Sequence, residues 1–133
     1  MEHTFKIEKE LKITTKDIVY YVLCFEAGGF DYWGELCSDE RDYEAARQRL
    51  TERENADMKP CYEDVLAEIL ESGGKLTVYD REDDKDHELT MEKLLNGWKK
   101  YVEDYNAYDF DKYDGISADC IMQYAIFGEV IYG

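Results

Sequence analysis

The chain has 133 residues, 44% of them hydrophobic and 14% aromatic, and its 32 acidic residues against 16 basic ones give a formal net charge of −16. This length and apolar content predict one folded domain in spite of the charge repulsion, with a negative field that disfavours nucleic acid and anionic membranes and favours a basic protein partner. There is no apolar run of ~20 residues for a membrane span and no signal peptide, so we expect a cytoplasmic protein.

The first quarter of the chain predicts a strand and a helix. Apolar residues share one parity across residues 5–13, which predicts a half-buried strand. Thr14 and Asp17 mark the start of a helix that ends at Gly28 and Gly29. The many β-branched and aromatic residues of this segment leave a buried strand as the alternative.

The middle of the chain contains a charged, insertion-like stretch at about 35–60, which we expect to be either a short exposed helix or a loop. Pro60 then opens a predicted helix over residues 62–71.

The second half predicts a hairpin and two helices. Residues 75–80 and 87–90 are expected to pair around an acidic turn, and Thr90 to cap a helix over 91–105, in which Gly97 indicates close packing. Ser117 is the predicted cap of a last helix, and the apolar chain end is expected to dock on the body. These elements predict an α+β fold, a small and mostly antiparallel sheet packed against three to four helices, in a single domain over residues 1–133.

The sequence lacks the residue patterns of common enzymes. It contains no P-loop, dinucleotide-binding, nucleophile-elbow or HExxH motif. His87 is expected to be an exposed strand histidine, the four cysteines are expected to be buried thiols in a reducing compartment, and the acidic segments starting at Asp80 and Asp109 do not fit an EF-hand loop. We therefore expect no enzyme activity, no catalytic residue, no metal and no cofactor.

The negative charge is concentrated in two segments. Residues 80–88 carry a net charge of −4 and residues 101–133 a net charge of −6. Duplex DNA carries one charge per ~1.7 Å, so carboxylates about a helical turn apart can present a similar array to a basic groove, and interleaved tyrosines can add flat contacts. The candidate partner-binding residues are Asp104, Tyr105, Tyr108, Asp109, Asp111 and Asp114.

A second candidate site is the turn that contains Tyr32 and Trp33. Two aromatic residues beside Gly28 and Gly29 could line a pocket for a small ligand or a peptide. The alternative is a helix that ends in glycine and is followed by core aromatics.

Five segments carry a family resemblance: ITTKDI (13–18), EAGGFDYW (26–33), GGKLTVYD (73–80), ELTMEKLLNG (88–97) and DCIMQYAIFGEVIYG (119–133). They resemble a family of small acidic proteins encoded by phages, prophages and mobile elements of gut bacteria. The family has no assigned chemistry, so the resemblance implies a context and no catalytic residue. Small acidic proteins of such elements include antagonists of restriction and CRISPR nucleases. The resemblance thus implies a nucleic-acid mimic that binds a basic, nucleic-acid-binding enzyme.

Overall fold

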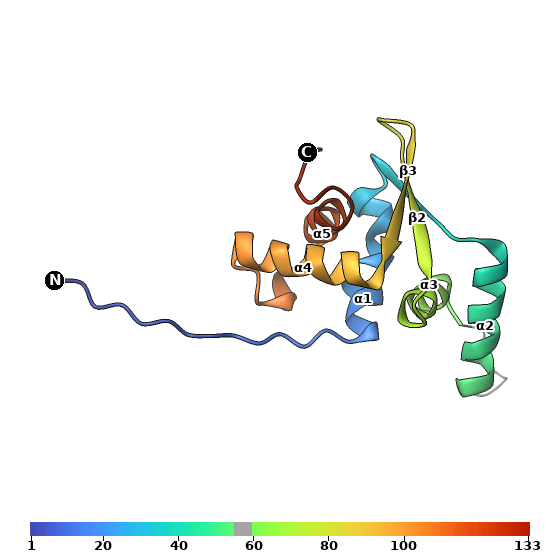
Figure 1. Cartoon of the computed structure of the whole chain (residues 1–133), viewed down its shortest axis with the longest axis horizontal. Coiled ribbons are helices and arrows are strands. Elements are labelled where there is room, and N and C mark those ends of the chain that lie inside the picture. The colour runs from blue at the N-terminus through green and yellow to red at the C-terminus, as the bar shows by residue number, and fades with distance from the viewer. Residues whose placement is uncertain (55–59) are drawn as a thin grey trace.

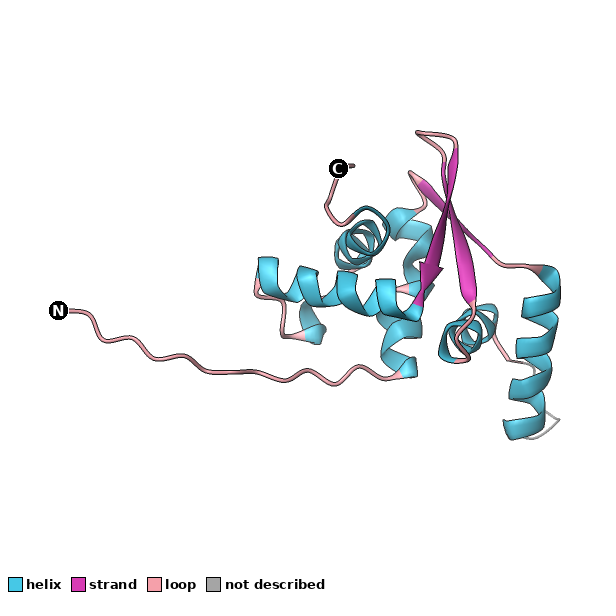
Figure 2. Cartoon of the chain, viewed as in Figure 1, coloured by secondary structure: helices cyan, strands magenta, loops and turns pink. Residues whose placement is uncertain are grey.

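The protein has an α+β fold, as expected, in a computed structural model that describes residues 1–54 and 60–133 (Figure 1). Within these residues, helices pack beside a three-stranded antiparallel sheet whose hairpin end projects beyond them (Figure 2). In chain order the elements are α1 (Thr15–Tyr21), η1 (Leu23–Phe25), η2 (Glu26–Phe30), β1 (Gly34–Cys37), α2 (Glu40–Glu54), α3 (Tyr62–Glu71), β2 (Lys75–Asp80), β3 (Lys85–Thr90), α4 (Met91–Tyr105), η3 (Phe110–Lys112) and α5 (Gly115–Phe127).

The sheet has the order β1-β2-β3, with the β2–β3 hairpin that the sequence predicts. Val78 of β2 lies opposite Leu36 of β1 and His87 of β3, and Leu76 lies opposite Leu89. The leucine and valine side chains of this face are buried in the core. β1 is a strand that the sequence does not predict.

The helices bury one side of the sheet. α4 and α5 pack so closely that a Cβ atom at Gly97 would lie 2.5 Å from the backbone nitrogen of Ala125. This confirms the close packing expected at Gly97.

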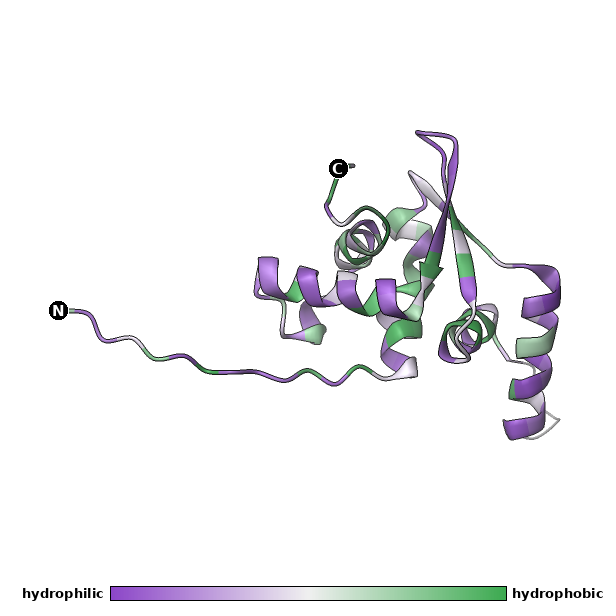
Figure 3. Cartoon of the chain, in the orientation of Figure 1, coloured by the Kyte–Doolittle hydropathy of each residue, from purple (hydrophilic) through white to green (hydrophobic). Residues whose placement is uncertain are grey.

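α2 is the most hydrophilic helix in the view of Figure 3, and of its described side chains only Ala46 is buried. Over residues 40–54 the charged stretch is therefore the exposed helix of the two alternatives, although this helix is longer than expected. The start of the stretch belongs to β1, and its residues 55–59 lie outside the described residues.

Residues 1–14 do not form the predicted strand. They form an extended arm whose second half lies along α4 and whose first half runs away from the body (Figure 1), and no backbone hydrogen bond joins residues 2–13 to any described residue. The alternating pattern is present, but the arm has no sheet edge beside it. A strand without a partner cannot pair its backbone groups, so the prediction is wrong.

The starts of the helices follow their capping residues. Thr14 and Asp17 form the expected capping box of α1, but regular α-helix ends at Tyr21, and the chain reaches Gly28 through η1 and η2. α3 has its predicted bounds. α5 begins earlier than predicted, because Asp114 is its cap and Ser117 is the reciprocal partner.

Two side-chain predictions need correction. Cys120 is buried and Cys37 partly buried, but Cys24 and Cys61 are exposed, because they lie in the short helix η1 and just before α3. His87 is half-buried and meets the ring of Phe127 edge-on, at 5.2 Å between ring centroids. Among the described residues, no helix has the length and apolar character needed to cross a membrane.

Candidate functional site

An aromatic cluster holds the acidic segment after α4 against the body. The indole nitrogen of Trp98 donates to the Tyr113 hydroxyl at 3.1 Å, and that hydroxyl donates to the carbonyl of Ala107 at 2.7 Å. The Phe110 ring lies 5.2 Å from Tyr21 and 5.0 Å from Tyr113. Rings in such contact stabilise each other by ~0.5–1.5 kcal/mol per pair beyond their burial. The segment is therefore held at several points.

Three predicted acidic residues are fixed by hydrogen bonds that each use one carboxylate oxygen. Asp109 Oδ1 accepts the Asp111 N–H at 3.0 Å, and Asp114 Oδ1 accepts two N–H groups at the start of α5. Asp104 Oδ2 accepts the Tyr124 hydroxyl at 2.8 Å. The second oxygen of each carboxylate makes no hydrogen bond to any described residue, and the three residues are exposed. These carboxylates are thus oriented and still available to a partner.

The structure adds an acidic residue that the sequence analysis missed. Burial raises the pKa of Tyr21, and the charges of Asp111, Asp17 and Asp109 raise it further, so the negative charges of all three carboxylates act on this one hydroxyl. Asp17 belongs to α1 and is far from the others in sequence. The contacts of Tyr21 with Phe110 and Tyr113 bring the two segments together.

The two predicted tyrosines, Tyr105 and Tyr108, differ in how accessible their rings are to a partner. Tyr105 is 55% exposed and packs on Tyr101 at 5.1 Å between ring centroids. Tyr108 is half-buried, and the ammonium of Lys9 lies 4.4 Å from its ring centroid. Tyr105 can therefore meet a partner directly, whereas Tyr108 already binds a cation of its own chain.

The acidic turn of the hairpin is a separate surface. Glu82, Asp83, Asp84 and Asp86 are exposed, whereas Asp80 is buried and accepts the N–H of Glu82. β3 and α4, each about 20 Å long, separate this turn from η3 and run in different directions in Figure 1. The two acidic segments therefore do not form one continuous array.

Trp33 packs as a core aromatic. Its side chain is fully buried between Phe30, Phe127 and Tyr132, and its indole N–H donates to Asp119 at 2.7 Å. Tyr32 is half-exposed and donates to the same carboxylate at 2.6 Å. Neither residue lines the cavity between α1, α2 and α3 or the cavity between α4 and the N-terminal arm.

A buried polar network joins this turn to the chain end. Gln123 donates to Asp119 at 2.9 Å, and its carbonyl oxygen accepts the backbone N–H groups of Ile131 and Tyr132 at 2.8 Å each. The Tyr132 hydroxyl donates to Asp80 at 2.7 Å, which raises the pKa of Tyr132 to about 12. The tail thus docks as expected at Tyr132, although Ile131 stays 47% exposed. The sequence offers no signal for this network beyond the polar residues within an apolar helix.

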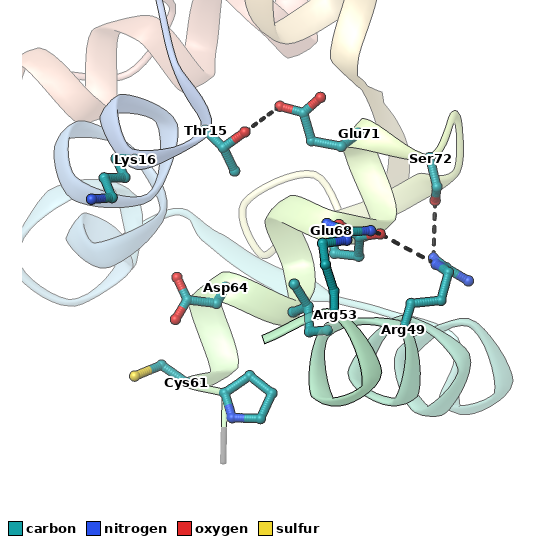
Figure 4. A pocket seen from close by; sticks show the side chains of 11 residues that line it. Thr15, Lys16, Arg49, Arg53, Cys61, Asp64, Glu68, Glu71 and Ser72 are labelled. Carbon is teal, nitrogen blue, oxygen red and sulfur yellow. Dashed lines mark hydrogen bonds and ion pairs between the residues drawn. The ribbon is translucent and has the colours of Figure 1, made fainter. Parts of the chain in front are cut away.

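A cavity of about 820 Å³ lies between α1, α2 and α3 (Figure 4). In its wall Glu68, whose side chain is 8% exposed, pairs with Arg53 at 2.8 Å and with Arg49 at 3.3 Å. The hydrogen bond from Arg53, followed by that from Arg49, holds the pKa of Glu68 below its usual range against the opposing effect of burial. Across the cavity the Thr15 hydroxyl donates to Glu71 at 2.5 Å.

The charged side chains in the wall of this cavity form ion pairs that connect α2 to α3. An ionised Glu68 cannot act as a general acid near neutral pH, and its single negative charge is already paired with both guanidinium groups. Among residues 1–54 and 60–133, no three His, Cys, Asp or Glu side chains are placed to hold a metal ion. The acidic surface after α4 is therefore the stronger candidate site.

Comparison with models of protein families, with curated proteins and with solved structures found no match. The resemblance to proteins of mobile elements stays an expectation from the sequence.

Proposed function

We propose that this protein is a non-enzymatic binding module that holds a basic protein partner at an acidic surface formed by Asp17 and by residues 104–114. We call it the α4–η3 surface. Its partner is a nucleic-acid-binding enzyme, and the carboxylates take the place of phosphates. In its finer form the proposal is inhibition of a host defence nuclease in the cytoplasm, of the anti-restriction or anti-CRISPR type. That finer form depends on the resemblance to proteins of mobile elements.

One observation carries the proposal: the carboxylates are held in place before any partner arrives. Asp104, Asp109 and Asp114 each have one oxygen fixed by an internal hydrogen bond and one oxygen without a hydrogen bond among residues 1–54 and 60–133. Ordering a side chain at an interface costs ~0.5–1.5 kcal/mol, and part of that cost is already met in folding. A fixed row of negative groups is what a groove built to bind phosphates can recognise.

The position of these residues favours binding over catalysis. Asp104, Asp109, Asp111 and Asp114 are exposed, and none of them lines either described cavity. The exposed ring of Tyr105 lies beside them and supplies the kind of aromatic contact that is enriched at interfaces.

The test is capture of purified basic enzymes, namely a restriction endonuclease, a DNA methyltransferase and a CRISPR nuclease, at low and high salt. The test variant replaces Asp104, Asp109, Asp111 and Asp114 by asparagine. Asparagine is a good cap and keeps an acceptor oxygen, so the fold should persist. At ~0.2–1 kcal/mol for each exposed ionic contact, the affinity should fall by roughly fivefold to several hundredfold.

The matched control removes four charges from the other acidic surface by Glu82→Gln, Asp83→Asn, Asp84→Asn and Asp86→Asn. It has the same net charge as the test variant and should retain capture. Competition by duplex DNA would support mimicry, because both ligands would occupy one groove. Equal loss in the two variants would mean that overall charge, and not this surface, drives binding, and no capture from the panel would reject the proposed partner class.

A further inference from the structure

The N-terminal arm has the pattern of a strand and lacks a partner. Phe5 and Ile7 are 81% and 72% exposed, and they share one parity with Leu11 and Ile13. The backbone groups of residues 2–13 make no hydrogen bond to any described residue. Single exposed apolar residues are ordinary, but a run of them on one side of an extended, unpaired segment indicates an interaction site.

The second half of the arm lies along α4 and leaves a groove open. A cavity of about 470 Å³ is lined by Leu11 and Ile13 from the arm and by Leu95, Trp98 and Val102 from α4. Leu95 and Leu11 are 39% and 37% exposed. The first half of the arm continues past the end of α4, where no described residue covers it (Figure 1). The chain thus carries both an open apolar groove and an uncovered apolar half-strand.

The two halves of the arm are related by symmetry about Lys9. When two copies of the strand pair antiparallel with Lys9 at the centre, Phe5 of each copy lies opposite Ile13 of the other, and Ile7 lies opposite Leu11. This register brings the uncovered apolar residues of one copy over the groove of the other. A two-fold contact requires this reciprocity, in which residue i meets residue j and j meets i.

We propose that two copies of this chain form a dimer by pairing their N-terminal arms antiparallel about Lys9, with Phe5 and Ile7 of each copy seated on α4 of the other. The partner is a second copy because one strand supplies both the exposed residues and the groove that fits them. A strand from a different protein would have to carry the same spacing.

The arm is also the segment without net charge, although pairing about Lys9 sets Lys6 opposite Lys12 and Glu8 opposite Glu10, so the apolar contacts must outweigh these like-charge pairs. Residues 1–14 contain three lysines and three acids, so the net charge of −16 resides entirely in the rest of the chain. Two bodies of that charge repel each other, and the arm is the neutral segment through which they can associate. Lys9 itself interrupts the apolar side, but its ammonium lies over the Tyr108 ring, next to the acidic α4–η3 surface. The Tyr108 ring and the neighbouring acidic residues therefore stabilise the positive charge of Lys9.

The first test is the mass of the full chain in solution, measured by light scattering or sedimentation up to about 0.5 mM, where dimers of micromolar Kd are populated. The mass should rise with concentration from 15.7 kDa toward twice that value. Ile7→Glu should keep the protein monomeric, and its circular dichroism should be unchanged because Ile7 contacts little of its own body. Glu8→Gln, on the opposite side of the strand, should leave the dimer intact.

The second test fixes the register by cross-linking, with Cys24 and Cys61 replaced by serine. Lys9→Cys places two thiols directly opposite each other, within the range of a disulfide, whereas Glu8→Cys places them two residues out of register. Lys9→Cys should cross-link much faster. A chain that is monomeric at all concentrations, or a dimer that survives Ile7→Glu, would overturn the proposal. Equal cross-linking of the two cysteine variants would overturn the pairing about Lys9.

Discussion

Gly97→Ala is expected to destabilise the fold although alanine is the better helix former. The new methyl carbon would lie 2.5 Å from the backbone nitrogen of Ala125 and 2.7 Å from its Cα atom. Carbon atoms in contact prefer about 3.5–4.0 Å, so α4 and α5 must separate by about 1 Å. Both obstructing atoms belong to the backbone of α5, so no side-chain rotation relieves the clash.

The expected size of this effect follows from two opposing contributions. Alanine gains about 1 kcal/mol of helix propensity over glycine, whereas overpacking costs ~1–3 kcal/mol and separation of the helices loosens the contacts of the buried Trp98. We expect a net loss of about 2 kcal/mol, and a fall in Tm of roughly 6–10 °C for a chain of this length.

The assay is thermal and urea unfolding followed by tryptophan fluorescence and circular dichroism. The control is Asn96→Ala at the neighbouring exposed position of α4, which gains a few tenths of a kcal/mol in helix propensity and meets no obstruction. If Gly97→Ala raised the Tm as Asn96→Ala does, the close contact of α4 and α5 would be refuted.

Three further predictions concern buried polar groups. Asp119→Asn should cost about 2–3 kcal/mol in unfolding free energy, because the carboxylate accepts the Trp33 indole and other donors that an amide cannot all satisfy; unchanged urea unfolding would contradict this. Tyr132→Phe should cost about 1–3 kcal/mol through loss of the hydrogen bond to the buried Asp80, and amide exchange should report a looser hairpin turn. The lowered pKa of Glu68 means that its stabilising contribution is present above the unfolded value of about 4.3 and is lost as the pH falls through the folded value. The stability gap between wild type and Glu68→Gln should therefore shrink in acid, and a gap that is independent of pH would argue against an ionised Glu68.

The parts of the fold that sequence predicts are those with local signals. α3 has its predicted bounds because an apolar stripe lies between Pro60 and Gly73, and the β2–β3 hairpin follows from period-two alternation around a polar turn. The arm shows the limit of that signal, since alternation gives a strand only where an edge is available. β1 was missed because its four residues show too little alternation, and its place depends on β2, which lies far along the chain.

The sequence predicts which residues make up the candidate site, but it does not predict how their side chains are arranged. The sequence locates the acids at 104–114, but it cannot show that Asp109 and Asp114 are caps with one oxygen left free. It also cannot place Asp17 beside them, because that contact depends on the packing of Tyr21 against Phe110. Similarly, a turn of two aromatics beside glycines fits a ligand pocket and a core equally well, and only the burial of Trp33 shows its place in the core.

The docked tail has a consequence for how the protein folds during synthesis. The ring of Trp33 is covered by Phe127 and Tyr132, which are translated long after it. Until they leave the ribosome, the Trp33 ring stays uncovered, and the Gln123 carbonyl lacks the N–H groups of Ile131 and Tyr132 that it accepts in the folded protein. Domains fold as units, so we expect the native core to close only after translation of residue 132. Chaperone binding to the growing chain should therefore persist until that point.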